Sequence, residues 1–581
     1  MQQKLRQEIE SQIGDRMPTH EDRNRCHYVM AFIAETMRFR NVIPVSPLHK
    51  TVVQTKIGDY TVPKDTAVTL YHHNILNNPK YWENPNELIP ERFLDSDGQY
   101  MTSHNKAFIP FGVGRRVCLG EKLAIADLFL VLVSFLQLTQ QYDIVLAKHS
   151  GDPVIVINDI DLGKELFRKN DAAGRYNIYL FELVNNGKRS DIVGADYGHT
   201  WEALRRVGHS AVQKYSTSDK LVLLVRDCVE RTVEMMVDNE GLNKPFVATD
   251  YIYQMFFNIL STSAFGKSYD TNNKEYKQIK YVMKDFMREN STKFLLLQVL
   301  PVARYVFKGM ADKQKRIMND MLDMLKNKFV KHYEDFDESS QRDFCDALIS
   351  AKNDALRDGK ESAPYLTDDN LSMTIFDLFF AGTDTSQQTF QWLLLFLCYY
   401  PEMQQKLRQE IESQIGDRMP THEDRNRCHF IMAFIAETMR FRNVVPLSPL
   451  HKTVVQTKIG DYTVPKGTAV TLYHHNILNN PKFWENPDQL IPERFLESDG
   501  QYMTSRNKAF IPFGVGRRVC LGEKLAIADL FLVLVSFLQS TQQYDIVLAK
   551  HSGIDPEPNI ADSINPKHYE IKFVHKLQLA N

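Results

Sequence analysis

The chain has few cysteines, no long hydrophobic run and almost no net charge. Seven cysteines in 581 residues, with no C-x-x-C pair, are typical of reduced thiols facing the cytosol rather than of a disulfide-stapled secreted protein. A formal net charge of -2 gives no general attraction to nucleic acid, so we expect no nucleic-acid partner. We also expect no signal peptide and no membrane-spanning helix, because the most apolar stretch is interrupted by Asp377 and Asp384.

The chain does contain a long internal duplication. Residues 1–151 reappear as residues 403–553, with scattered exchanges such as Asp65 against Gly467. A copy of this length and fidelity is a duplicated part of a fold and not a short structural repeat. We therefore expect two domains, 1–151 as an incomplete duplicate and 152–581 as the main domain. The segment from about 153 to 402 occurs once.

The periodicity of the single-copy segment predicts a mainly α-helical fold with small β-sheets. Residues 153–159 form a β-branched strand pattern, and Asp159 is placed to cap the helix that follows. The duplicated block adds two helices and short strands at 453–473, where Gly460 and Gly467 mark turns. Small sheets therefore flank a helical body.

The ten residues FGVGRRVCLG occur in both copies, at 111–120 and 513–522, each before an apolar helix. The free N–H groups at a helix N-terminus lower the pKa of a nearby thiol, which lets the sulfur act as a metal ligand. The glycines allow close backbone approach to a flat cofactor, and Arg518 is placed to meet an anionic group. A lone cysteine is usually structural, but here four further positions match as well: Phe513, Gly516, Arg518 and Gly522.

A second pattern lies in the apolar helix around FFAGTDTSQQTF, residues 379–390. Gly382, Asp384 and Thr385 all cost helix stability or burial energy in its middle. A carboxylate beside a hydroxyl can relay protons to a bound ligand. The alternative is a threonine that hydrogen-bonds back to its own helix.

A third pattern places Glu437 and Arg440 three residues apart on one helical face, with Arg494 further along the chain. Such a pair is worth little at a surface. Because Phe434 and Met439 make the surrounding helix apolar, we expect a buried glutamate shared by two arginines.

From about Pro153 onward, these residues resemble the cytochrome P450 family of haem-thiolate monooxygenases, and its animal microsomal branch with steroid 17-hydroxylases and drug-metabolising forms in particular. The resemblance implies the cytochrome P450 fold, with the N-terminal block as a partial duplicate of its C-terminal portion. It implies Cys520 as axial ligand of a haem b iron and Asp384 and Thr385 as catalytic residues. The other roles that it implies are haem binding by Trp201, Arg205, His451, Phe513, Gly516, Arg518 and Gly522, a structural triad of Glu437, Arg440 and Arg494, and a substrate pocket at Ala381, Val445 and Leu447.

The same resemblance implies the partners of the protein. They are O₂, a small hydrophobic substrate, NADPH-cytochrome P450 reductase as electron donor, and cytochrome b5. The reductase is expected on a basic patch to which Arg206, Lys214, Arg517 and Lys524 contribute. The expected location is the cytosolic face of the endoplasmic reticulum membrane, with residues 292–310 dipping into the bilayer surface.

Three alternatives stand beside this hypothesis. One is a haem-thiolate isomerase or dehydratase that uses no O₂, and another is a non-catalytic or unstable fusion of two genes. Zinc binding by the Cys-His pairs at 26–27 and 428–429 is a weaker one, because adjacent helical side chains point apart. Members of the branch begin with a membrane anchor, whereas here the duplicate precedes the single-copy strand. We expect one haem per chain, on Cys520 and not on Cys118, because residues 1–151 contain no counterpart of Trp201 or of residues 379–390.

Overall fold

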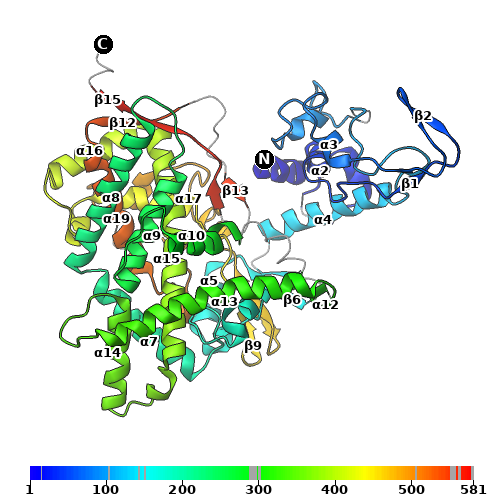
Figure 1. Ribbon diagram of the computed structural model, residues 1–581. Helices are drawn as coiled ribbons and strands as arrows, with labels where there is room; N and C mark the ends of the chain where they lie inside the picture. The colour runs from blue at the N-terminus through cyan, green and yellow to red at the C-terminus, as the bar shows by residue number, and fades with distance from the viewer. Residues whose placement is uncertain are drawn as a thin grey trace. The chain divides into compact units, whose positions relative to one another are not determined.

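A computed structural model describes residues 1–14, 16–101, 105–141, 144–149, 152–286, 297–298, 303–503, 507–549, 558–560 and 564–576. The chain forms two compact units, Met1–Tyr142 and Asp143–Asn581. We call them the duplicate unit and the main unit (Figure 1). No helix in the described ranges is both long enough and apolar enough to cross a bilayer.

The main unit is mostly helical. Its helices are α5 (Ile160–Arg168), α6 (Tyr179–Leu183), α7 (His199–Tyr215), α8 (Asp219–Glu240), α9 (Thr249–Phe265), α10 (Lys274–Lys280), α12 (Ala303–Val306), α13 (Lys308–Lys331), α14 (Phe344–Arg357), α15 (Asp368–Tyr399), α16 (Pro401–Gln414), α17 (His429–Phe441), α18 (His474–Leu478) and α19 (Glu523–Ser540). The mainly α architecture expected from periodicity is confirmed.

Helix α15 runs through the centre of this body and packs against α9 and α13 (Figure 1). It begins where the Thr367 side chain accepts a hydrogen bond from the Asn370 amide, which satisfies one of the free N–H groups of the first turn. Its second half is buried from Ser386 to Cys398, and Phe390 and Trp392 are fully buried. A helix buried all round acts as a rigid central element.

The strands of the main unit form one five-stranded sheet and three pairs. They are β5 (Ile144–His149), β6 (Asp152–Ile157), β7 (Gly174–Arg175), β8 (His451–Lys452), β9 (Thr457–Ile459), β10 (Tyr462–Val464), β11 (Ala469–Leu472), β12 (Tyr544–Leu548), β13 (Pro558–Ile560), β14 (Ile564–Pro566) and β15 (Ile571–His575).

The five-stranded sheet has the order β5-β6-β11-β8-β7. Strand β6 lies where the β-branched pattern predicts one, and Asp159 caps α5 by accepting from the amides of Asp161 and Leu162. Strand β6 pairs in parallel with β11, with Val154 opposite Ala469. This pairing joins the single-copy segment to the second copy of the duplicated block.

The duplicate unit has the same local elements as the second copy. They are α1 (Gln2–Gln12), α2 (His27–Phe39), α3 (His72–Leu76), α4 (Glu121–Gln141), β1 (His49–Lys50), β2 (Thr55–Ile57), β3 (Tyr60–Val62) and β4 (Ala67–Val68). One small core joins α1, α2 and α4 through residues such as Leu5, Val29 and Phe129. A second surrounds Trp82 and Phe93.

The two units divide before the duplicated sequence ends at Gly151, because β5 belongs to the main unit. Strand β5 pairs with β6 in an antiparallel ladder from Ile144↔Ile157 to His149↔Asp152. Its counterpart in the second copy is β12, which pairs with β15 instead. Nearly identical sequences thus pair with different strands, because a different segment follows each copy in the sequence.

Candidate functional site

The loop 513–522 has a fixed shape that presents Cys520 just before α19. The left-handed conformations of Gly514 (φ 78°) and Gly516 (φ 82°) turn the chain, and the Cys520 amide donates to the Phe513 carbonyl oxygen over 3.0 Å. A Cβ on Gly516 would lie 2.1 Å from the Phe167 carbonyl oxygen. Only glycine therefore allows this close approach of the loop to α5.

The electrostatics of Cys520 combine opposing effects. Desolvation by the surrounding protein raises the pKa of the thiol, whereas hydrogen bonds from the Gly522 and Glu523 amides and the charge of Arg205 lower this pKa. The side chain remains accessible to solvent. Desolvation has the larger effect, so the pKa of the Cys520 thiol lies above its usual value, and the lowered pKa expected from the helix N-terminus is not found. The sulfur is nonetheless accessible to a ligand partner.

Arginine and tryptophan side chains from distant parts of the chain gather beside this loop. Arg518 donates to the carbonyl oxygens of Ala173 and Ala195, each over 2.7 Å, and its Cζ lies 4.5 Å from the centroid of the Trp201 ring. Arg205, from α7, donates to the Val519 carbonyl oxygen over 2.6 Å. The structure therefore brings together Trp201, Arg205 and Arg518, which are separated by up to about 300 residues in the sequence.

These cations lack a carboxylate partner within the described ranges. The guanidinium groups of Arg518, Arg205 and the nearby Arg175 donate to backbone carbonyl oxygens, such as those of Val193 and Pro449 for Arg175. The Arg175 backbone amide donates to Asp196 Oδ1, and the charges of Asp191 and Asp196 act on the cluster without a direct ion pair to these guanidinium groups among the described residues. Burial, followed by the charge of Arg175, lowers the pKa of Arg518 to about 8. Burial lowers the pKa of Arg175 to about 10. A buried positive cluster of this kind favours an anionic ligand.

Two further groups mark the same region. The indole Nε1 of Trp201 is buried and has no hydrogen-bond partner among the residues that the structure describes, although a buried donor without a partner is costly. His451 is buried, and its Nδ1 lies 3.0 Å from the Ala172 carbonyl oxygen. Burial and then the charge of Arg175 hold the pKa of His451 well below its usual value, so the ring is neutral near pH 7.

On α15, the polar residues in the apolar helix are held locally. The Thr385 hydroxyl donates to the Ala381 carbonyl oxygen over 2.8 Å, which is the back-bond of the alternative interpretation. Asp384 accepts from Gln388 Nε2 over 2.8 Å and from Gln387 Nε2 over 3.3 Å. Burial raises the pKa of Asp384, which favours its neutral form.

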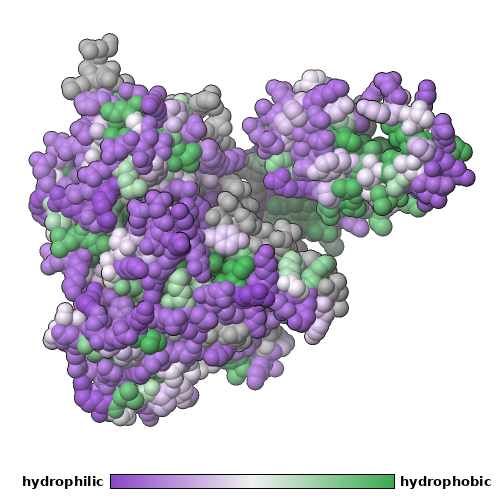
Figure 2. All heavy atoms as spheres, viewed as in Figure 1, coloured by the Kyte–Doolittle hydropathy of each residue, from purple (hydrophilic) through white to green (hydrophobic). Residues whose placement is uncertain are grey.

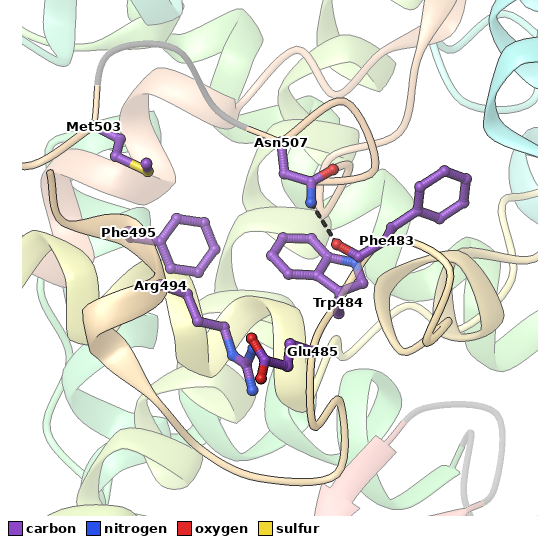
Figure 3. A pocket seen from close by; sticks show the side chains of 7 residues that line it. All are labelled: Phe483, Trp484, Glu485, Arg494, Phe495, Met503 and Asn507. Atoms are coloured by element: carbon purple, nitrogen blue, oxygen red, sulfur yellow. Dashed lines mark hydrogen bonds between the residues drawn. The ribbon is translucent and has the colours of Figure 1, made fainter.

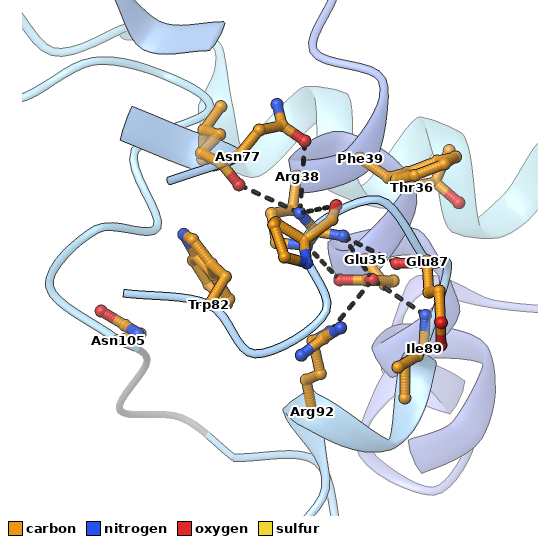
Figure 4. Close-up of polar contacts among 12 residues, drawn as sticks. Glu35, Thr36, Arg38, Phe39, Asn77, Trp82, Glu87, Ile89, Arg92 and Asn105 are labelled. Atoms are coloured by element: carbon orange, nitrogen blue, oxygen red, sulfur yellow. Dashed lines mark hydrogen bonds and ion pairs between the residues drawn. The ribbon is translucent and has the colours of Figure 1, made fainter. Parts of the chain in front are cut away.

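Glu437, Arg440 and Arg494 meet in a buried network. Arg440 Nε lies 2.7 Å from Glu437 Oε2, and Arg494 Nε lies 3.3 Å from Glu437 Oε1. Arg440 also donates to the Leu478 carbonyl oxygen over 3.0 Å. The duplicate unit repeats this network with Glu35, Arg38 and Arg92 (Figure 4).

A family model described as Cytochrome P450 matches residues 1–138 and 137–573. The chain belongs to the cytochrome P450 family. It is 34% identical over 359 residues to mouse cytochrome P450 2U1, and the alignment covers 61% of this chain and 66% of the relative. It is 31% identical over 398 residues to the steroid 17-alpha-hydroxylase/17,20 lyase of Squalus acanthias, which covers 66% of this chain and 76% of the relative. The chain thus spans about two thirds to three quarters of these relatives.

A solved structure of zebra fish cytochrome P450 with progesterone has a TM-score of 0.65 and 27% sequence identity to this chain. The likeness covers 75% of this chain and 98% of that structure. The cytochrome P450 fold with small sheets, expected from the resemblance, is confirmed. The family model matches twice, in agreement with a duplicated portion.

Membership of the P450 family implies a haem iron, and the residues of the main unit fit this group. A thiol accessible to solvent lies before a helix N-terminus. Beside it, the partnerless Trp201 Nε1 and the arginines without carboxylates match the chemistry of haem propionates. The fit comes from observations independent of the match to the family.

Arg175 belongs to this cluster and was missed by the sequence analysis. Its guanidinium is buried and reaches the carbonyl oxygens of Val193 and Pro449 over 2.8 Å and 3.0 Å. No spacing pattern singles it out, because its partners come from segments up to 274 residues away. The one local cue is an arginine that directly follows the small residues Ala172 to Gly174.

The three residues expected to line a P450 substrate pocket differ in exposure. Ala381 and Leu447 are exposed, and Val445 is partly buried. A separate cavity of about 330 Å³ lies elsewhere, lined by Phe483, Trp484, Glu485, Arg494, Phe495, Met503 and Asn507 (Figure 3). Its lining contains no residue of the Cys520 loop, 513–522, so we do not assign this cavity to the P450 site.

The duplicate unit repeats the P450 loop without its surroundings. Gly112 and Gly114 have φ values of 83° and 77°, and the Cys118 amide donates to the Phe111 carbonyl oxygen over 3.1 Å. Arg116, however, is exposed, in contrast to the partly buried Arg518. The loop conformation is thus local, whereas the cationic cluster depends on residues of the single-copy segment.

Proposed function

We propose that this chain is a haem-thiolate monooxygenase that inserts one oxygen atom from O₂ into a small hydrophobic organic substrate, steroid-like or xenobiotic. The observation that carries this proposal is the contact of the Cys520 loop with the cations Arg518 and Arg205 and with the Trp201 ring. The substrate class is supported by the steroid hydroxylases among the relatives.

In this proposal the main unit would hold haem b through the sulfur of Cys520. Arg518, Arg205, Arg175 and Trp201 would bind the propionates, and neutral His451 would add a further polar group. Phe513, Gly516 and Gly522 shape the loop. When bound, a thiolate-ligated haem supplies the electron density that favours cleavage of O₂.

Asp384 and Thr385 would hold and relay protons for the reaction. A raised pKa lets the Asp384 carboxyl hold a proton near neutral pH, and a neutral carboxyl both donates and accepts hydrogen bonds. The Thr385 hydroxyl, while it donates to Ala381, keeps its oxygen free to accept. The hydrophobic substrate would lie near Ala381, Val445 and Leu447.

Electrons come from NADPH through a cytochrome P450 reductase, with cytochrome b5 as a second partner. Arg206, Lys214, Arg517 and Lys524 are all exposed, as a basic docking patch requires. We place the protein at the cytosolic face of the endoplasmic reticulum membrane. About half of the segment proposed to dip into the bilayer, 292–310, lies outside the described residues, and its membrane contact stays a prediction. Neither the isomerase or dehydratase nor the non-catalytic fusion is favoured by these findings.

The proposal is tested by matched serine variants of the two loop cysteines. We expect Cys520→Ser to abolish the red-shifted carbon-monoxide absorbance band of a thiolate haem, because the main unit surrounds only this sulfur with the cationic cluster. Cys118→Ser should leave the band and the NADPH-dependent oxidation of a steroid or xenobiotic intact. Two haems per chain, or the reverse pattern in the two variants, would overturn the assignment.

A further inference from the structure

The duplicate unit exposes an apolar face that the second copy buries. Val131 and Phe135 on α4 are 68% and 53% exposed, whereas their counterparts Val533 and Phe537 on α19 are both 0% exposed. Leu123, Leu128, Val42 and Ile57 are likewise exposed, and their counterparts Leu525, Leu530, Val444 and Ile459 are buried. Five of these residues, Val42, Leu123, Leu128, Val131 and Phe135, make up what we call the duplicate face. Ile57 is left out because it pairs across its hairpin with the exposed Tyr60.

The difference in exposure comes from the surroundings of the two copies and not from their internal structure. The network of Glu35, Arg38 and Arg92 repeats that of the second copy, and Phe129 and Val133 on the opposite side of α4 are buried in both copies. The duplicate unit therefore keeps the shape of the second copy. In the second copy, α19 lies against α8 and α15 of the single-copy segment, whereas the corresponding positions of the duplicate unit are exposed.

The duplicate face is one stripe of a helix together with nearby loops. Leu128, Val131 and Phe135 are spaced three and four residues apart, so they lie on one side of α4. Figure 2 shows hydrophobic residues gathered along this helix. An exposed apolar patch of this kind on a folded unit marks an interaction surface.

The polar groups around the duplicate face favour a protein over a lipid surface. Asp127 is exposed beside Val131 on the next turn of α4, and Arg116 is exposed in the adjoining loop. Strand β4 pairs only with β1 among the described strands, whereas its counterpart β11 also pairs with β6. A free strand edge and an exposed carboxylate are costly in hydrocarbon, but both are satisfied at the hydrated rim of a protein interface.

The number of single-copy segments per chain decides which protein surface can cover the duplicate face. Each chain has one single-copy segment, and residues 403–549 already occupy it. In an exchange, the duplicate unit of one chain would replace residues 403–549 on the single-copy segment of another chain. This would expose one apolar face for every face that it covers, so it gains no net burial of apolar surface. Within one chain, exchange would also require β5 to leave β6, because its counterpart β12 pairs with β15. Pairing of two duplicate faces, in contrast, removes both from water.

We propose that the duplicate face is the contact surface of a symmetric homodimer, in which α4 of one chain packs against α4 of a second copy. The same patch on both chains satisfies the symmetry of a twofold contact. The proposal is independent of the oxidative chemistry, because no residue of the duplicate face belongs to the haem site.

The first experiment measures the mass of the full-length chain by analytical ultracentrifugation over a range of concentrations. We expect a reversible monomer–dimer equilibrium. The double variant Val131→Asp/Phe135→Asp should weaken it by about tenfold or more, because it places charge at the centre of the contact. The control is Tyr60→Asp, since Tyr60 is 80% exposed and its counterpart Tyr462 is 68% exposed, so this position lies outside the duplicate face.

The second experiment identifies the contact by cross-linking. In a Cys118→Ser background, Val131→Cys chains should form covalent dimers with a short bis-maleimide, and Tyr60→Cys chains should not. Lys106→Cys/Asp161→Cys chains test for exchange. Lys508, the counterpart of Lys106, lies 2.6 Å from Asp161 in the main unit, so residue 106 would come close to residue 161 only if the duplicate unit took the place of the second copy. Covalent dimers from this last pair, absent from either single variant, would overturn the proposal in favour of exchange.

The third measurement separates a protein partner from a membrane. A chain that remains monomeric at all concentrations overturns the proposal. If the same chain sediments with phosphatidylcholine–phosphatidylserine vesicles and loses this binding in Val131→Asp/Phe135→Asp, the duplicate face is a lipid contact. Circular dichroism of each variant confirms that α-helix content is retained, so that lost association is not lost folding.

Discussion

Asp127 and Asp529 occupy the same place in the two copies, but their surroundings differ completely. Asp529 is buried within α19, and its Oδ1 has no hydrogen-bond partner in the described part of the chain. Asp127, in contrast, is exposed on α4. Burial raises the pKa of Asp529 well above its usual value, so the folded main unit holds this carboxyl in its neutral form.

This difference predicts a pH effect on stability. Because the pKa of Asp529 is higher in the folded than in the unfolded chain, its contribution is fully present below the unfolded pKa and is lost as the pH rises toward the folded pKa. We expect Asp529→Asn to gain stability relative to the wild type between about pH 5 and about pH 8, by roughly 1 kcal/mol or more at the upper end. Chemical unfolding of the main unit across this range measures it.

The matched control is Asp127→Asn, which should leave the pH dependence unchanged because this side chain is already in water. A parallel pH profile for wild type and Asp529→Asn would mean that Asp529 is not neutral in the folded chain.

Thr385 gives a second prediction at this scale. If Thr385 and Asp384 deliver protons, Thr385→Ala should keep haem and substrate binding but divert NADPH electrons to peroxide or water. The ratio of product to NADPH consumed should fall by about tenfold or more. Thr389→Ala is the control, because the Thr389 hydroxyl makes the same kind of back-bond, to the Thr385 carbonyl oxygen. Equal coupling in Thr385→Ala and wild type would leave Thr385 with a purely structural role.

At the scale of elements, α2 and α17 carry the same buried ion-pair network in different units. Arg38 and Arg440 are both fully buried, as are their partners Glu35 and Glu437. Removal of one partner from a buried pair leaves an uncompensated charge and costs about 3–5 kcal/mol. The two networks therefore report separately on the two units.

We predict that Arg440→Leu destabilises the main unit by about 3 kcal/mol or more and lowers haem retention. Arg38→Leu should destabilise the duplicate unit by a similar amount and leave haem absorbance unchanged. Limited proteolysis, read by the release of fragments from 1–142 or from 143–581, assigns each loss to its unit. Loss of haem in Arg38→Leu would show that the haem site depends on the duplicate unit.

At the scale of the whole molecule, the division into two units predicts two unfolding transitions. Only the main unit contains the cationic cluster, so only its transition should respond to a ligand of the haem iron such as imidazole. At a concentration of about 100 times Kd, the ligand should stabilise the main unit by about 2.7 kcal/mol. Differential scanning calorimetry with and without imidazole measures both transitions.

The Val131→Asp/Phe135→Asp chain is the matched control for this measurement, because it changes the duplicate face but not the haem site. Its main transition should shift with imidazole as in the wild type. A single cooperative transition that shifts as a whole would mean that the two units unfold together.

Local patterns were readable from the sequence because they depend on residues close together in the chain. The strand at β6, the cap at Asp159 and the long helix α15 all follow from spacing and capping. The loop around Cys520 belongs to the same class, since its glycines and backbone hydrogen bonds are repeated at Cys118. The duplication itself is readable in the sequence as an offset of 402 residues.

The tertiary structure alone decided what surrounds each copy. It buries Val533 and leaves Val131 in water, pairs β5 with β6 but β12 with β15, and gathers Arg175 beside Arg518. These outcomes depend on contacts between segments far apart in the chain, and two nearly identical sequences contain no information about which neighbour each one meets. The sequence thus determined the local conformation of both copies, and long-range packing determined that only the copy with Cys520 is enclosed by the single-copy helices.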